Sequence, residues 1–112
     1  MILKLKKMFE TVFIILILDV VALIYFVFPP KKANAIYGYR TSRTLQNDKI
    51  FSYANRYASR YMLILSVLNT IVNLFLILLD YTDMNLAAFT SITSLVVVII
   101  LTEKKLNKYS GE

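Results

Sequence analysis

The sequence predicts an all-α integral membrane protein with about three transmembrane helices and a cytoplasmic, interfacial amphipathic helix. Of its 112 residues, 58% are hydrophobic, and a soluble domain of that length has too little interior to bury so much apolar surface. The hydrophobic residues also gather in three runs of the length that crosses a bilayer as a helix. We therefore expect one membrane domain over residues 1–112, with spans at about 9–28, 61–80 and 85–102.

Each run has recognisable ends. The first, Thr11 to Phe28, would span roughly 27 Å at about 1.5 Å per residue. Pro29 and Pro30 should end it, because proline lacks the amide hydrogen and restricts the residue before it. The second run is Met62 to Leu79. The third, Leu86 to Leu101, is shorter and begins with more polar residues.

The N-terminus also permits a different interpretation, a cleaved signal peptide. The start MILKLKK resembles a basic n-region, and Ala33-Asn34-Ala35 is a small-x-small cleavage pattern. However, the apolar run is longer than the usual core of a signal peptide, and it contains Asp19. Two prolines and two lysines also crowd the cleavage site, so we favour a retained first span.

Lysine and arginine are distributed unevenly between the two sides that three spans would define. The N-terminus shares one side with the turn near 80–85 and carries three lysines. The loop at 29–61 shares the other side with the C-terminal tail, and together they carry ten basic residues. The positive-inside rule then places the loop and the tail in the cytoplasm, although the three N-terminal lysines favour the inverse.

The composition argues against several classes of function. Cysteine and histidine are absent, which excludes disulfides, thiol nucleophiles, Cys/His zinc sites and an imidazole base. We therefore expect no enzyme, no metal and no cofactor. The net charge of +6 fits contact with anionic lipid or an acidic partner. Nucleic-acid binding is disfavoured, because the basic residues flank membrane-length apolar runs.

The segment between the first two runs is polar, and Gly38 lies within it. Glycine adopts positive φ at little cost, so a tight turn is expected near Tyr37–Arg40. Arg40 suits a lipid phosphate, a partner carboxylate or the carbonyls that end a helix. Thr44 is expected to cap an amphipathic helix over 45 to about 59, either continuous with the second span or hinged near Arg60. The plainer alternative is a connecting loop without a function of its own.

The order of residues in this segment resembles the SdpI/YfhL family of small bacterial membrane proteins. The family pattern is a proline, then N-x-x-x-G-[YFI]-R-T, then a Ser/Thr, an Asn, a Trp and a final A-N pair. The chain matches it at Pro29, Pro30, Asn34, Gly38, Tyr39, Arg40, Thr41, Thr44, Asn47, Ala54 and Asn55. Phe51 stands where the family usually has tryptophan, which keeps a ring but loses the indole N–H.

The resemblance implies a membrane immunity protein of the bacterial inner membrane. Such a protein protects the cell against a secreted, membrane-active toxin peptide and can also sequester a cytoplasmic repressor at the membrane. The resemblance marks as candidate site residues Asn34, Gly38, Arg40, Thr41, Thr44, Asn47, Phe51 and Asn55, without individual roles. The family member of known role has about six spans, so immunity carries over to this shorter chain more readily than signalling.

Polar side chains also occur inside the spans. Asp19 lies near the middle of the first, where an ionised carboxylate costs a few kcal/mol. Asn69 and Asn73 are four residues apart and hence on one helix face. The partners expected for Asp19 are Asn69, Thr70 and Asn73 in the second span or Thr90, Thr93 and Ser94 in the third.

Three functions are compatible with these residues. The leading one is the immunity protein, which should form a homo-oligomer in the lipid bilayer because three short helices shield little surface. The second is a small oligomeric transporter or ion-coupled carrier that uses Asp19; the plainer interpretation of that residue is a polar contact that fixes helix packing. The third is a tether whose basic loop recruits a cytoplasmic protein.

Overall fold

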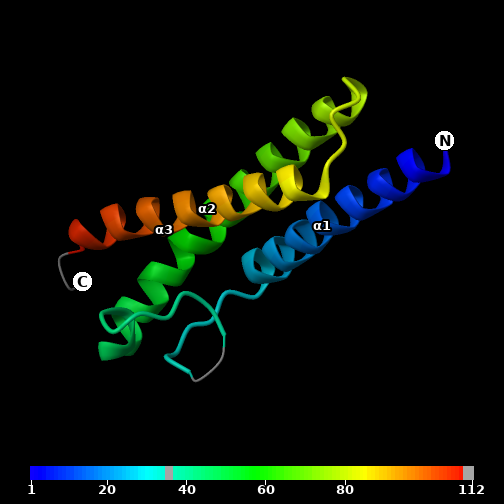
Figure 1. Cartoon of the computed structure of the whole chain (residues 1–112). Helices are drawn as coiled ribbons and strands as arrows, with labels where there is room; N and C mark the ends of the chain where they lie inside the picture. The colour runs from blue at the N-terminus through cyan, green and yellow to red at the C-terminus, as the bar shows by residue number, and fades with distance from the viewer. Residues whose placement is uncertain (35–36, 110–112) are drawn as a thin grey trace.

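The computed structural model describes residues 1–34 and 37–109, and these form three long α-helices and one 3₁₀ turn, with no β-strand among them. Helix α1 spans Ile2–Val27, α2 spans Asp48–Leu78 and α3 spans Met84–Asn107, and the turn η1 covers Thr44–Gln46 (Figure 1). Each of the three helices is long and apolar enough to cross a membrane. The predicted all-α, multi-pass membrane fold is thereby confirmed.

The three helices form an elongated bundle of 56 × 23 × 20 Å. Helix α2 packs against both α1 and α3, which contact each other less. In Figure 1, α3 crosses α2 at an angle, and the loop between α1 and α2 lies beside the start of α2 and the end of α3. This arrangement gathers the long loop and the C-terminal end of α3 at one end of the bundle.

The other end of the bundle holds the N-terminus and the turn between α2 and α3. Lys4 forms an exposed ion pair of 2.6 Å with Asp80. Asp80 ends α2 with a positive φ of 67°, and the amide of Tyr81 donates to the carbonyl of Leu76 at 2.8 Å, as in a common helix-ending motif. The N-terminus and the 80–85 turn therefore share an end, as the three-span topology predicts.

The predicted amphipathic helix is the first part of α2. Residues 48–60 continue into the second apolar run without a hinge at Arg60. One buried face explains the continuity, since Phe51, Ala54 and Ala58 are all buried at helical spacing. A helix of 31 residues is about 46 Å long, so α2 exceeds the roughly 30 Å of a hydrocarbon core.

The predicted start of this helix is wrong. Thr44 does not cap it; the N-cap of α2 is Asn47, whose Oδ1 accepts a hydrogen bond of 2.9 Å from the amide of Ile50. Asn47 has the extended backbone typical of that position, with φ −158° and ψ 166°. Thr44 instead begins η1 and is fully buried, with its hydroxyl bonded inside the loop.

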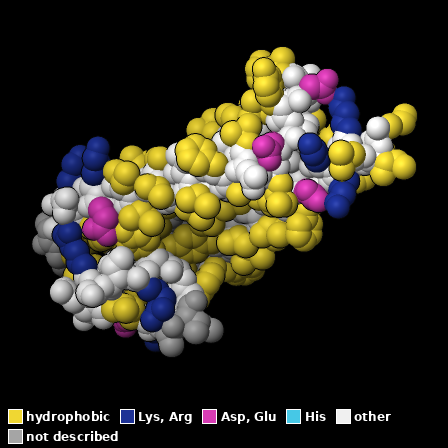
Figure 2. Space-filling model, in the orientation of Figure 1, with side chains coloured by type: hydrophobic (Ala, Val, Ile, Leu, Met, Phe, Trp, Pro, Cys, Tyr) yellow, Lys and Arg dark blue, Asp and Glu magenta, His cyan; other side chains and the backbone are white. Residues whose placement is uncertain are grey.

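Many of the buried side chains are small or polar, whereas most of the large apolar ones are exposed. Phe13, Ile71 and Leu78, for example, face outward. The buried residues between the helices include Thr11, Ala22, Ala58, Ser59, Ser66, Asn69, Asn73, Ala87, Ser91 and Thr102. Figure 2 shows hydrophobic side chains over the middle of the visible face and lysine and arginine near its two ends. Such a distribution is typical of helices that pack in lipid, where apolar side chains need no burial.

Candidate functional site

Asn55, one of the family-pattern residues, lies at the centre of the candidate site. Its side chain is 0% exposed. Its Oδ1 accepts hydrogen bonds from the hydroxyl of Tyr25 in α1 and from the amide of Tyr39 in the loop. Its Nδ2 donates to the carbonyls of Tyr39, at 3.2 Å, and of Phe51, at 2.9 Å. Every donor of the amide is used, so one side chain joins α1, α2 and the loop.

Gly38 approaches Asn55 closely because it has no side chain. Its φ is +99°, in the region that favours glycine. A Cβ atom at this position would lie 2.5 Å from Asn55 Oδ1 and 2.6 Å from Pro30 Cγ. The predicted turn is present, and the closeness of Asn55 and Pro30 adds a second requirement for glycine there.

Tyr39 connects the loop to α3. Its hydroxyl donates to Glu103 Oε1 at 2.5 Å. Burial raises the pKa of the Tyr39 hydroxyl above its usual range. The hydrogen bond to Glu103 and the negative charge of Glu103 raise this pKa further. Sequence reasoning had not singled out Glu103 or Tyr25. The sequence gives one weak indication for Tyr25, which is a tyrosine near the end of the first apolar run.

Asn34 and Arg40 organise the exposed side of the loop. Asn34 Oδ1 accepts from the amide of Tyr37 at 2.7 Å, and its Nδ2 donates to the carbonyl of Lys32 at 3.1 Å. Arg40 Nε donates to the carbonyl of Asn34 at 2.8 Å. The hydroxyl of Tyr37 reaches back to the carbonyl of Phe28, the C-cap of α1, at 2.8 Å. Arg40 thus binds a loop carbonyl rather than the carbonyls that end a helix.

Thr41 and Thr44 fix the turn that leads into α2. The amide of Thr41 donates to Thr44 Oγ1 at 2.8 Å, and the amide of Thr44 donates to Thr41 Oγ1 at 3.2 Å. Thr44 Oγ1 also lies 3.2 Å from the carbonyl of Tyr39.

Phe51 is fully buried in the first turns of α2. We call residues 29–47 with the start of α2 (residues 48–58) the loop cap.

A second contact holds the loop cap to the end of α3. Arg43 donates from Nη1 to Asn107 Oδ1 at 2.9 Å and from Nη2 to the carbonyl of Leu106 at 2.7 Å. The hydroxyl of Tyr53 lies 3.3 Å from the carbonyl of Lys105. Arg43 therefore takes the helix-ending role that the sequence had left open for Arg40.

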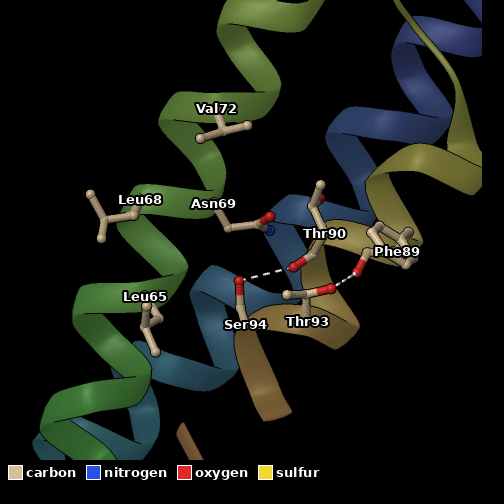
Figure 3. A pocket seen from close by; sticks show the side chains of 8 residues that line it. All are labelled: Leu65, Leu68, Asn69, Val72, Phe89, Thr90, Thr93 and Ser94. Atoms are coloured by element: carbon tan, nitrogen blue, oxygen red, sulfur yellow. Dashed lines mark hydrogen bonds between the residues drawn. The ribbon is translucent and has the colours of Figure 1, made fainter. Parts of the chain in front are cut away.

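The two predicted intramembrane asparagines share the face of α2 that packs against α3. Asn69 Nδ2 donates to Ser91 Oγ at 3.0 Å, and Asn73 Nδ2 lies 3.0 Å from Thr90 Oγ1, so both amides face α3. Figure 3 shows Asn69 pointing from α2 toward Thr90 in α3. A groove of about 230 Å³ runs beside this contact and is lined by Leu65, Leu68, Asn69, Val72, Phe89, Thr90, Thr93 and Ser94.

Asp19 contacts a different residue of α2. Its Oδ2 lies 2.5 Å from Thr70 Oγ1, whereas the structure does not bring it to Asn69 or Asn73. Thr70 was one of its predicted partners. Asp19 Oδ1 is buried and has no hydrogen-bond partner among the described residues.

Comparison with known proteins gives two related matches. Residues 31–102 match the SdpI/YfhL protein family. The chain is also 34% identical over 79 residues to the "Uncharacterized protein YfhL" of Bacillus subtilis (strain 168), a match that covers 70% of this chain and 69% of that protein. No solved structure matches the chain. The family match begins in the loop cap and continues through α2 into the last turns of α3.

Proposed function

Because the chain belongs to the SdpI/YfhL family, we propose that it is a membrane immunity protein that protects a bacterium against a secreted, membrane-active toxin peptide. The observation that supports this most is the convergence of the family-pattern residues on one structural unit. In the loop cap, Tyr39 and Asn55 are hydrogen-bonded to each other and Gly38 lies against Asn55. Bonds from Asn55 to Tyr25 and from Tyr39 to Glu103 join this unit to α1 and α3. The family-pattern residues thus hold the three helices in a fixed arrangement at this end of the bundle. Recognition of a peptide in the membrane requires such a fixed arrangement.

The protection we propose involves no catalysis. The amide of Asn55 and the hydroxyl of Thr44 are bonded inside the loop cap, and a nucleophile or general base needs a free polar atom that can reach a substrate. The toxin peptide would instead be bound and blocked. The apolar, outward faces of the helices offer it a surface of matching chemistry.

In the orientation we propose, the loop cap and the C-terminus lie in the cytoplasm of a bacterial cell and the chain acts as a homo-oligomer in the inner membrane. Ten of the 13 basic residues are at that end, in agreement with the positive-inside rule. The exposed side chains of Arg40, Arg56 and Arg60 would be accessible there to a cytoplasmic regulator of acidic character.

The test is survival of a toxin-sensitive bacterium that expresses this chain, challenged with membrane-active peptides secreted by related bacteria. We expect survival to rise with the wild-type chain and to fall with Asn55→Ala, which opens the loop cap. Ser42→Ala, an exposed loop position, is the matched control and should protect fully. Equal membrane abundance of the three proteins must be established by quantitative blotting. No protection by wild type at normal abundance would contradict the proposal.

One observation favours a second candidate, an ion-coupled carrier. Asp19 is a carboxyl group inside an apolar span, with one oxygen unpaired among the described residues. A carrier of this kind would move protons across vesicles that contain the purified chain, and Asp19→Asn would abolish the flux. Protection without flux would leave only the immunity function.

A further inference from the structure

Asp19 has no countercharge at its depth in the bundle. It is the ninth of the 18 residues of the apolar run at 11–28. Helix α2 carries no charged residue over 61–79, and α3 carries none over 84–102. On α1 the nearest charged residue is Glu10, nine positions away, or about 13 Å along the helix axis. That residue is also acidic. Pairing with a cationic side chain is therefore excluded for this carboxyl group.

The hydroxyl of Thr70 is shared between two oxygen atoms. Thr70 Oγ1 lies 2.5 Å from Asp19 Oδ2 and 3.0 Å from the backbone carbonyl oxygen of Ser66. A threonine hydroxyl has one hydrogen to donate and two lone pairs to accept with. It can donate to the carboxyl group or to the carbonyl, but not to both.

The two charge states of Asp19 differ in how well they fit this geometry. If Asp19 were ionised, Thr70 would donate to Oδ2, and a full negative charge would remain with Oδ1 buried and unbonded. If Asp19 carries a proton on Oδ2, it donates to Thr70 Oγ1, and Thr70 in turn donates to the carbonyl of Ser66. The unbonded Oδ1 is then the carbonyl oxygen of a neutral acid, which is far less costly to leave unpaired in an apolar medium.

We propose that Asp19 is an intramembrane proton-binding site whose proton lies on Oδ2, in a line of hydrogen bonds from Asp19 through Thr70 to the Ser66 carbonyl. Uptake of one proton from water takes the carboxylate from charge −1 to 0 and forms one O–H bond on Oδ2. No other covalent bond changes, and the hydroxyl hydrogen of Thr70 turns from Asp19 to the carbonyl of Ser66. The packing of α1 on α2 at mid-depth then depends on this proton. The proposal holds whether or not the chain confers immunity.

Infrared spectroscopy of the full chain in vesicles of ether-linked phosphatidylcholine, which has no ester carbonyl, tests the proposal, because a protonated carboxyl group has a carbonyl stretch that a carboxylate lacks. At neutral pH we expect this band in wild type and its loss in Asp19→Asn. The control Glu10→Gln should keep the band. A neutral-pH spectrum without it in wild type would overturn the proposal.

Substitution of Thr70 tests the hydrogen-bond chain independently of Asp19. Thr70→Val keeps the shape and removes the acceptor, so the carbonyl band should move to higher frequency, whereas Thr70→Ser should leave it in place. Asp19→Asn should insert and fold, since its carboxamide can donate to Thr70 as the acid does. If that variant does not fold, the comparison of Thr70→Val with Thr70→Ser tests the proposal without it. A carbonyl band that does not shift in Thr70→Val would refute the hydrogen bonds from Asp19 through Thr70 to Ser66.

Discussion

Gly38 and Asn55 approach so closely that no other residue fits at position 38 without a shift. A Cβ atom there would lie 2.5 Å from Asn55 Oδ1, and the backbone already has φ +99°. We expect Gly38→Ala to reduce the free energy of unfolding by about 2 kcal/mol or more, because it adds a steric clash to the strain of positive φ. Denaturant unfolding in detergent measures the loss. Ser42→Ala is the control and should cost little. Equal stabilities of the two variants would contradict the prediction.

Asn55→Ala should be among the most destabilising substitutions in the loop cap. It leaves the Tyr25 hydroxyl and the Tyr39 amide without their acceptor, and each unsatisfied buried group costs about 1–3 kcal/mol. Asn47→Ala makes the same chemical change at a helix cap, where about 1 kcal/mol is expected. The prediction fails if both variants unfold at the same denaturant concentration. A double-mutant cycle of Asn55→Ala with Tyr25→Phe should also show coupling.

Arg43→Gln should loosen the end of α3 and leave the rest of the bundle unchanged. The side chain donates to the carbonyl of Leu106 and to Asn107 Oδ1, and a charge-assisted bond of this kind is worth about 1.5 kcal/mol or more. Amide hydrogen exchange over residues 103–108 should accelerate roughly tenfold. Arg40→Gln, which removes a bond to the Asn34 carbonyl in the loop, is the control. Similar exchange in both variants would show that Arg43 is not the cap.

The raised pKa of Tyr39 predicts that the folded protein loses stability at alkaline pH. Burial and Glu103 raise the pKa of its hydroxyl in the folded chain, while in the unfolded chain it ionises near the ordinary value of about 10. Below that pH both states hold the proton and Tyr39 contributes no pH dependence. Above it the unfolded chain releases the proton first, so stability falls as pH rises.

The measurement is thermal unfolding of wild type and Tyr39→Phe between neutral and strongly alkaline pH. The variant should lose less stability over that range. Tyr81→Phe removes an exposed tyrosine from the α2–α3 turn and should follow wild type. Parallel curves for Tyr39→Phe and wild type would rule out this role of Tyr39.

Some interactions in the loop cap were not predictable from local patterns. The contact of Tyr39 with Glu103 spans 64 positions and that of Tyr25 with Asn55 spans 30. The Thr44 cap was a reasonable local prediction, since threonine caps helices well. It failed because the hydroxyl of Thr44 is bonded by Thr41 and the Tyr39 carbonyl, which leaves Asn47 to cap α2.

Three apolar runs of membrane length were enough to predict the three helices, and the prolines and Gly38 determined where the chain leaves the first helix and bends. These are local properties, because hydrogen bonds within a helix and the φ angle of a residue depend on near neighbours. Tertiary structure decided that Asn55 joins three elements, that Asn69 and Asn73 face α3, and that Asp19 meets Thr70. Such pairings depend on how each helix is rotated against the next, and packing between distant segments sets that rotation.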